Sequence, residues 1–179
     1  MNKNITKPVI KKTVKLSIII VIAALLATVS VFSRALSHAN QPIFATIFTM
    51  GVLTLGHYGA ALSITLVAGT LYSFTSSLGF LIIFSWFMRG FTTDIVLRVS
   101  RAFKHEIPSP YKVAIAMTLG SLATGFSHYF VFIKLLQLIP EPPFSITMFT
   151  IGISATSTLI ASFLVSKYVF KRVKPLLFW

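Results

Sequence analysis

Residues 16–32 read LSIIIVIAALLATVSVF, a run without a charged side chain, and Lys11, Lys12 and Lys15 come shortly before it. A helix of ~20 apolar residues spans the ~30 Å hydrocarbon core of a bilayer. Further apolar runs follow along the 179 residues, 55% of which are hydrophobic. The pattern predicts an all-α integral membrane protein.

Six membrane helices are expected. They are Leu16–Phe32, Pro42–Leu55, Gly59–Phe74, Leu78–Val96, Val113–Leu136 and Phe144–Val165. Two are short or marginal for a full span, and the second is the weakest, since a short, a tilted and a partly re-entrant helix all fit it. Pro108, Pro110 and Pro140–Pro143 are expected to end one helix and begin the next. The chain is therefore expected to form one polytopic membrane domain over residues 1–179.

The cations predict the orientation of the bundle. Lys and Arg are absent from the connections 73–77 and 137–145. They gather in the amino-terminal tail, in the connection after the fourth helix and in the carboxyl-terminal tail, as Lys3, Lys7, Lys11, Lys12 and Lys15, then Arg98, Arg101, Lys104 and Lys112, then Lys167, Lys171, Arg172 and Lys174. The positive-inside rule places both termini in the cytoplasm, which requires an even number of crossings.

A cleaved signal peptide is the alternative for the first apolar run. That run is longer than a usual signal core of ~7–15 residues, and Ser33-Arg34-Ala35 makes a poor cleavage site. A retained membrane helix is the favoured interpretation.

Composition excludes several kinds of function. The formal net charge is +13, but the cations flank apolar runs, which fits lipid headgroups better than nucleic acid. No phosphate-binding Gly-x-x-x-x-Gly-Lys-Ser/Thr loop is present, and the chain has no cysteine. The three carboxylates, Asp94, Glu106 and Glu141, are spread too widely to meet. Neither an enzyme nor a bound metal or cofactor is expected.

Arg89 in the fourth helix is the most unusual residue. It lies about eleven residues, or ~16 Å, from the predicted outer end of that helix. A charge at that depth needs solvation, a partner or a cavity. Three interpretations stay open: Arg89 extends to the headgroups, pairs with Asp94, or serves a site. Asp94 is also spaced to pair with Arg98.

Small residues four apart mark close helix packing, because lipid gives no hydrophobic drive for helix association. Ala23 and Ala27 form such a pair in the first helix, with Ala24 and Thr28 adjacent. Packing inside the bundle and docking of another membrane protein are both consistent with this pair.

The whole pattern resembles the substrate-binding S component of an energy-coupling factor (ECF) vitamin transporter. The resemblance rests on length, basic apolar composition, six helices, Ala23-x-x-x-Ala27, the residues 55–60 (LGHYGA) and the tract from Arg89 to Asp94. It implies that Ala23 and Ala27 dock a transmembrane coupling subunit, that two separate subunits hydrolyse ATP in the plasma membrane complex, and that a loop near residues 33–41 closes over the substrate. A small self-associating channel or structural membrane protein without a high-affinity ligand is the alternative.

A binding site is predicted in the outer half of the bundle, where hydroxyl stripes on two helices meet aromatic residues. Its expected residues are Arg34, His38, Asn40, Tyr72, Trp86, His128, Tyr129, Lys134, Thr147, Thr150 and Ser154. Hydrogen bonding back to backbone carbonyls or across to neighbouring helices is the alternative role for each hydroxyl. Arg34 and Lys134 are the expected anion-attracting groups, and the ligand is expected to be a vitamin or related micronutrient.

The cation distribution generates a topology prediction. Labels on Glu106 and on both termini should be reachable only from the cytoplasm, whereas labels on Ser76 and Glu141 should be reachable from outside. Accessibility to an impermeant reagent in intact cells measures this. An externally accessible carboxyl terminus would imply five crossings and contradict the assignment.

Overall fold

The computed structural model describes residues 12–33, 40–104 and 107–177. Within them the chain is helical and forms six spans joined by short connections. In chain order the helices are α1 (Lys12–Val31), α3 (Asn40–Leu55), α4 (Ala60–Ser73), η2 (Gly79–Leu81) with α5 (Ile82–Val99), η3 (Ala102–Lys104), α6 (Pro110–Ser127) with the π-helix η4 (His128–Leu135), and α7 (Phe144–Leu164) with the π-helix η5 (Val165–Val169) and α8 (Phe170–Leu177).

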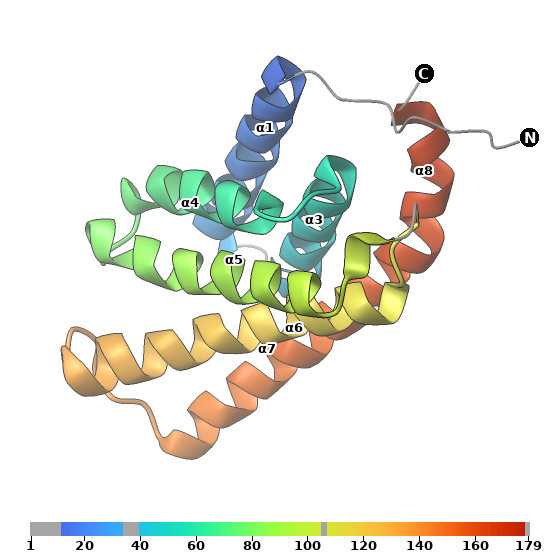
Figure 1. Ribbon diagram of the computed structural model, residues 1–179. Helices are drawn as coiled ribbons and strands as arrows, with labels where there is room; N and C mark the ends of the chain where they lie inside the picture. The colour runs from blue at the N-terminus through green and yellow to red at the C-terminus, as the bar shows by residue number, and fades with distance from the viewer. Residues whose placement is uncertain (1–11, 34–39, 105–106, 178–179) are drawn as a thin grey trace, which may run out of the picture.

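The spans form a closed ring of neighbours (Figure 1). α4 packs on α5, α5 on α6 and α6 on α7, and α3 then joins α7 to α1, which returns to α4. The connections 74–78 and 136–143 lie on the left of Figure 1, and the cation-bearing turn 100–104 and α8 lie on the right. α3 carries eight buried residues in its 16, so it is an interior helix of the bundle.

The predicted all-α bundle of six helices is confirmed, and its orientation stays a prediction. Four spans are long and apolar enough to cross a membrane, namely Lys12–Val31, Gly79–Val99, Pro110–Leu135 and Phe144–Pro175. α3 is one continuous helix and not a broken one. The chain is thus a multi-pass membrane protein.

The last helix is longer than predicted. The expected end at Val165 followed the end of the apolar run, but helical hydrogen bonding continues through η5 and α8 to Leu177. Lys167, Lys171 and Lys174 lie on this extension. Apolarity marks the part of a helix that lies in hydrocarbon, whereas the helix itself can extend into the polar interface.

Three glycines bring α4 and α6 close to α5. A Cβ built on Gly69 would lie 2.8 Å from the Cβ of Trp86, and one on Gly120 would lie 2.8 Å from the carbonyl oxygen of Arg89. A Cβ on Gly90 would lie 2.7 Å from the Cα of Leu62 and would also collide with the hydroxyl of Thr65. These contacts hold α5 between its neighbours at the positions of Trp86 and Arg89.

Asp94 joins the start of α4 to α5. Its Oδ2 accepts a hydrogen bond of 2.8 Å from the backbone N–H of Leu62, in the first turn of α4. Gly59 precedes this helix with φ +94°, a conformation that glycine adopts without strain. Early N–H groups of a helix have no partner within the helix, and an acidic side chain there also favours the helix dipole.

The glycine contacts generate a stability prediction. Gly90→Ala should lower the midpoint of thermal unfolding in detergent, with a loss of ~1–3 kcal/mol, because the new methyl group collides with backbone of α4. Gly152→Ala is the matched control, since a Cβ there meets nothing within 4 Å. It should leave the midpoint unchanged or raise it, because alanine favours helix. Equal midpoints for the two variants would contradict this packing.

Candidate functional site

Arg89 lies in the interior of the bundle, with its side chain 8% exposed. Its Nε donates a hydrogen bond of 3.1 Å to Thr124 Oγ1, and its Nη2 donates one of 3.4 Å to Ser121 Oγ. Its Cζ lies 4.5 Å from the centre of the Phe44 ring, a cation–π distance. The guanidinium of α5 thereby contacts α6 and α3 at once.

An aromatic cluster lies beside this cation. The Trp86 ring meets Phe44 edge-on at a centroid distance of 5.4 Å and meets Tyr72 at 5.9 Å. Trp86 itself is held against Gly69. Three helices therefore supply the rings, α3, α4 and α5.

A chain of hydroxyl and amide groups continues from Arg89 toward α7 and α3. Ser121 shares a hydrogen bond of 3.2 Å with Ser154 and accepts one of 3.4 Å from Thr158. Ser154 in turn donates to Gln41 Oε1 at 3.1 Å. This network positions the Gln41 amide at the start of α3.

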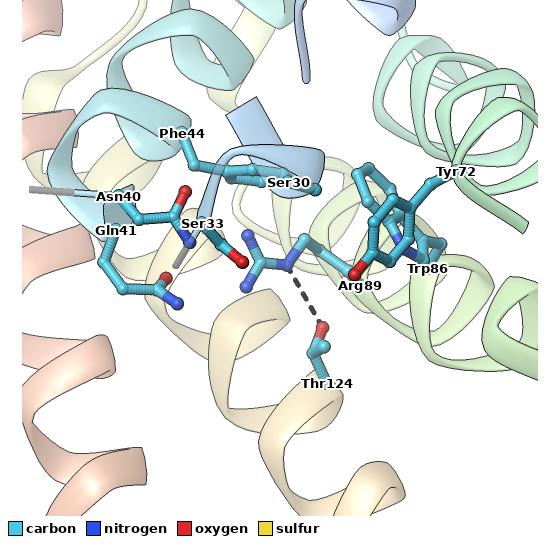
Figure 2. Close-up of a pocket in the computed structure, with 9 residues that line it drawn as sticks. All are labelled: Ser30, Ser33, Asn40, Gln41, Phe44, Tyr72, Trp86, Arg89 and Thr124. Carbon is cyan, nitrogen blue, oxygen red and sulfur yellow. Dashed lines mark hydrogen bonds between the residues drawn. The ribbon is translucent and has the colours of Figure 1, made fainter. Parts of the chain in front are cut away.

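Arg89, the aromatic cluster and the Gln41 amide border a cavity of about 180 Å³. Figure 2 shows the Arg89 guanidinium extending toward the polar side chains of Ser33, Asn40 and Gln41, with Tyr72 and Trp86 beside its aliphatic stem. The lining residues are Ser30, Ser33, Asn40, Gln41, Phe44, Tyr72, Trp86, Arg89 and Thr124. The carboxyl ends of α1 and α4 and the amino end of α3 supply most of them, and α5 and α6 supply Trp86, Arg89 and Thr124. The cavity therefore lies toward the end of the bundle opposite the cation-rich turns.

Four predicted site residues lie at or beside this cavity. Asn40, Tyr72 and Trp86 line it. Ser154 lies one hydrogen bond behind it, through Gln41. Arg34 and His38 lie outside the described residues.

The other five predicted residues do not line the cavity. His128 packs edge-on against Phe132 at 5.1 Å, and the buried Tyr129 contacts Phe130 and Phe144. Lys134, half exposed, forms an ion pair with Glu141. Thr147 and Thr150 donate to carbonyl groups of their own helix, at Pro143 and Ile146. Two of the three hydroxyls predicted for the site on α7 thus bond to carbonyl groups of their own helix, which was the alternative to ligand binding.

Six lining residues were not among the expected site residues, namely Ser30, Ser33, Gln41, Phe44, Arg89 and Thr124. Ser33 and Gln41 belong to the segment 33–41 that the resemblance implied would close over the substrate, and Thr124 belongs to the hydroxyl stripe of the fifth predicted helix. The one signal for Arg89 was its depth in an apolar helix. Neither suggested ion pair of Asp94 forms, because its carboxylate caps α4. Arg98 instead lies 5.8 Å from the Tyr58 ring.

Ala23 and Ala27 point into the bundle. Ala23 is fully buried and Ala27 is 8% exposed, in the helix that packs on α3 and α4. Their position favours the internal-packing role. Ala24 and Thr28, one residue further along, are on the exposed side of α1.

Comparison with known proteins identifies the fold. No protein-family model matches the chain, and no curated protein matches it. A solved structure described as an S component of an ECF transporter superposes with a TM-score of 0.69, over 94% of this chain and 89% of that one, at 19% sequence identity. The chain therefore has an S-component fold, as the sequence resemblance predicted.

The hydrogen bond between Arg89 and Thr124 generates a second stability prediction. Thr124→Val keeps the shape but removes the acceptor of a buried cation, and should cost ~1–3 kcal/mol of unfolding free energy. Thr150→Val changes an exposed residue of α7 and should cost much less. Thermal unfolding of both variants in detergent measures the difference. The same loss in both would show that Thr124 does not hold Arg89.

Proposed function

We propose that this protein is the membrane-embedded substrate-binding subunit of an ECF-type ABC transporter in the plasma membrane. It captures a vitamin or related micronutrient outside the cell. A transmembrane coupling subunit and two ATPase subunits then drive uptake. The observation that carries this proposal is a cavity with a buried cation and aromatic walls, within an S-component fold.

The chemistry of the cavity supports binding rather than catalysis as its role. Ligand sites combine aromatic walls with a few convergent polar groups, and this one combines the rings of Trp86, Tyr72 and Phe44 with the amide of Gln41 and the guanidinium of Arg89. Its predicted external position follows from the cations at the opposite end. A substrate bound there would reach the cytoplasm only if the bundle changed its conformation or its position in the membrane. This requirement fits a subunit that works with partners.

The partner interface is proposed on α1. Ala23 and Ala27 were predicted to dock the coupling subunit, and this stays a prediction. Because both methyl groups face the bundle, docking through this stretch of α1 would use its exposed side, which Ala24 and Thr28 share with Leu25 and Val21. Small residues there let another helix approach closely.

The test is co-purification with the coupling and ATPase subunits from the same cell. The wild-type chain should purify in mild detergent as a complex. Ala24→Trp should abolish the complex and uptake while the isolated chain stays monodisperse, because bulk is added only to the exposed side. Ala23→Trp is the matched control and should disturb folding itself, because that methyl group is fully buried.

Three outcomes distinguish the proposals. A complex that survives Ala24→Trp would remove this docking side. A wild-type chain that never associates with coupling subunits would remove the transporter role. Self-association without partners would favour the alternative of a channel or structural membrane protein.

A further inference from the structure

Within the part of the chain that the structure describes, Arg89 has hydrogen-bond donors without an acceptor. A guanidinium has five N–H donors. Among the described residues, the structure gives acceptors to two of its nitrogens, Thr124 for Nε and Ser121 for Nη2. The terminal nitrogens extend into the cavity, toward Ser33 and Gln41 (Figure 2).

The positive charge has no anionic partner in the part of the chain that the structure describes. Asp94 accepts the N–H of Leu62 at the start of α4. Glu141 pairs with Lys134. The cavity is lined by hydroxyl, amide and aromatic groups, which solvate a cation but leave its charge uncompensated. A cation removed from water and left unpaired is costly, so a bound anion would gain more here than at the surface.

The position of the aromatic rings places a second requirement on the ligand. Phe44 lies 4.5 Å from the guanidinium, and Trp86 and Tyr72 follow it along the same wall. A ligand whose anionic group reaches Arg89 places its remaining atoms against these rings. At about 180 Å³ the space suits a compact molecule with a small ring system.

We infer that the substrate is a small anion, an aromatic or heterocyclic ring that carries a carboxylate or another oxyanion, and that Arg89 binds the anionic group. The planar fork of arginine matches two oxygens of a carboxylate or phosphate. This inference rests on the proposed binding function and narrows its substrate class: neutral rings and ring cations are disfavoured.

The experiment uses the purified full-length chain. Compounds retained from the cell are released by denaturation and identified by mass spectrometry. In parallel, thermal stabilisation is measured with matched acid and amide pairs: benzoate with benzamide, indole-3-acetate with indole-3-acetamide, and biotin with biotinamide. Phenyl phosphate is compared with benzoate to distinguish a phosphate from a carboxylate group.

The inference expects an acidic ring compound among the retained molecules, or stabilisation by an acid but not by its amide. Arg89→Gln should weaken that binding roughly 10- to 150-fold, as expected for loss of a hydrogen bond to a charged group. Arg89→Lys should recover part of it, since the charge remains but the two-pronged geometry is lost. Arg98→Ala, in the last turn of α5 and away from the cavity, should bind normally.

Other outcomes overturn the inference. A retained neutral or cationic ligand, an amide that stabilises as well as its acid, or an acid that binds Arg89→Gln undiminished would each show that Arg89 is not an anion receptor. If Arg89→Gln fails to fold, the comparison of acid and amide binding to the wild-type chain still tests whether the site requires an anion. Binding of a non-acidic ligand would spare the transporter role, whereas absence of all binding would overturn both.

Discussion

The constraint on which the site depends is the burial of one permanent positive charge in a membrane protein. Arginine stays protonated at any physiological pH, so the protein cannot avoid the cost by releasing a proton. The bundle instead surrounds Arg89 with the hydroxyls of Thr124 and Ser121 and the face of Phe44. These groups come from two other helices, so the solvation of the cation also fixes the spacing of α3, α5 and α6. The neighbouring polar chain through Ser154 to Gln41 extends the same polar region to α7.

The second feature on which the site depends is the close packing of α4 and α6 against α5. Gly69 and Gly120 allow α4 and α6 to approach the backbone beside Trp86 and Arg89, where larger side chains would hold the helices apart. Preorganised groups bind a ligand with less loss of conformational entropy than mobile ones. The ring of Trp86 and the guanidinium of Arg89 are therefore carried by a helix that is held closely on two sides, whereas Asn40 and Gln41 are carried by the end of α3.

Much of the fold could be read from the sequence, because apolar runs and prolines mark membrane helices directly. Asn40, Tyr72 and Trp86, which were predicted to share a site, line the same cavity. Depth along a helix can be counted, so residues near the same end could be grouped. The direction in which a side chain points around its helix axis could not be predicted by such counting. Thr147 and Thr150 have a suitable depth, yet their hydroxyls bond within α7. Ala23 and Ala24 differ by one residue, and only packing decides which of them is buried. Asp94 was predicted to pair with a cation on its own helix. Residue spacing along one helix gives no information about the backbone N–H groups of another helix, so the bond from Leu62 could not be predicted.

The brevity of α4 has a consequence for the surrounding lipid. Its 14 residues extend ~21 Å, about 9 Å less than a ~30 Å hydrocarbon layer. Leu66 and Leu71 are exposed on this helix, so hydrocarbon chains contact it directly. Hydrophobic mismatch of this kind is relieved by local thinning of the bilayer, at a fraction of a kcal/mol per Å. The lipid beside α4 is consequently expected to be thinner than the lipid beside the 20-residue α1, so the protein should favour bilayers whose acyl chains tolerate this difference.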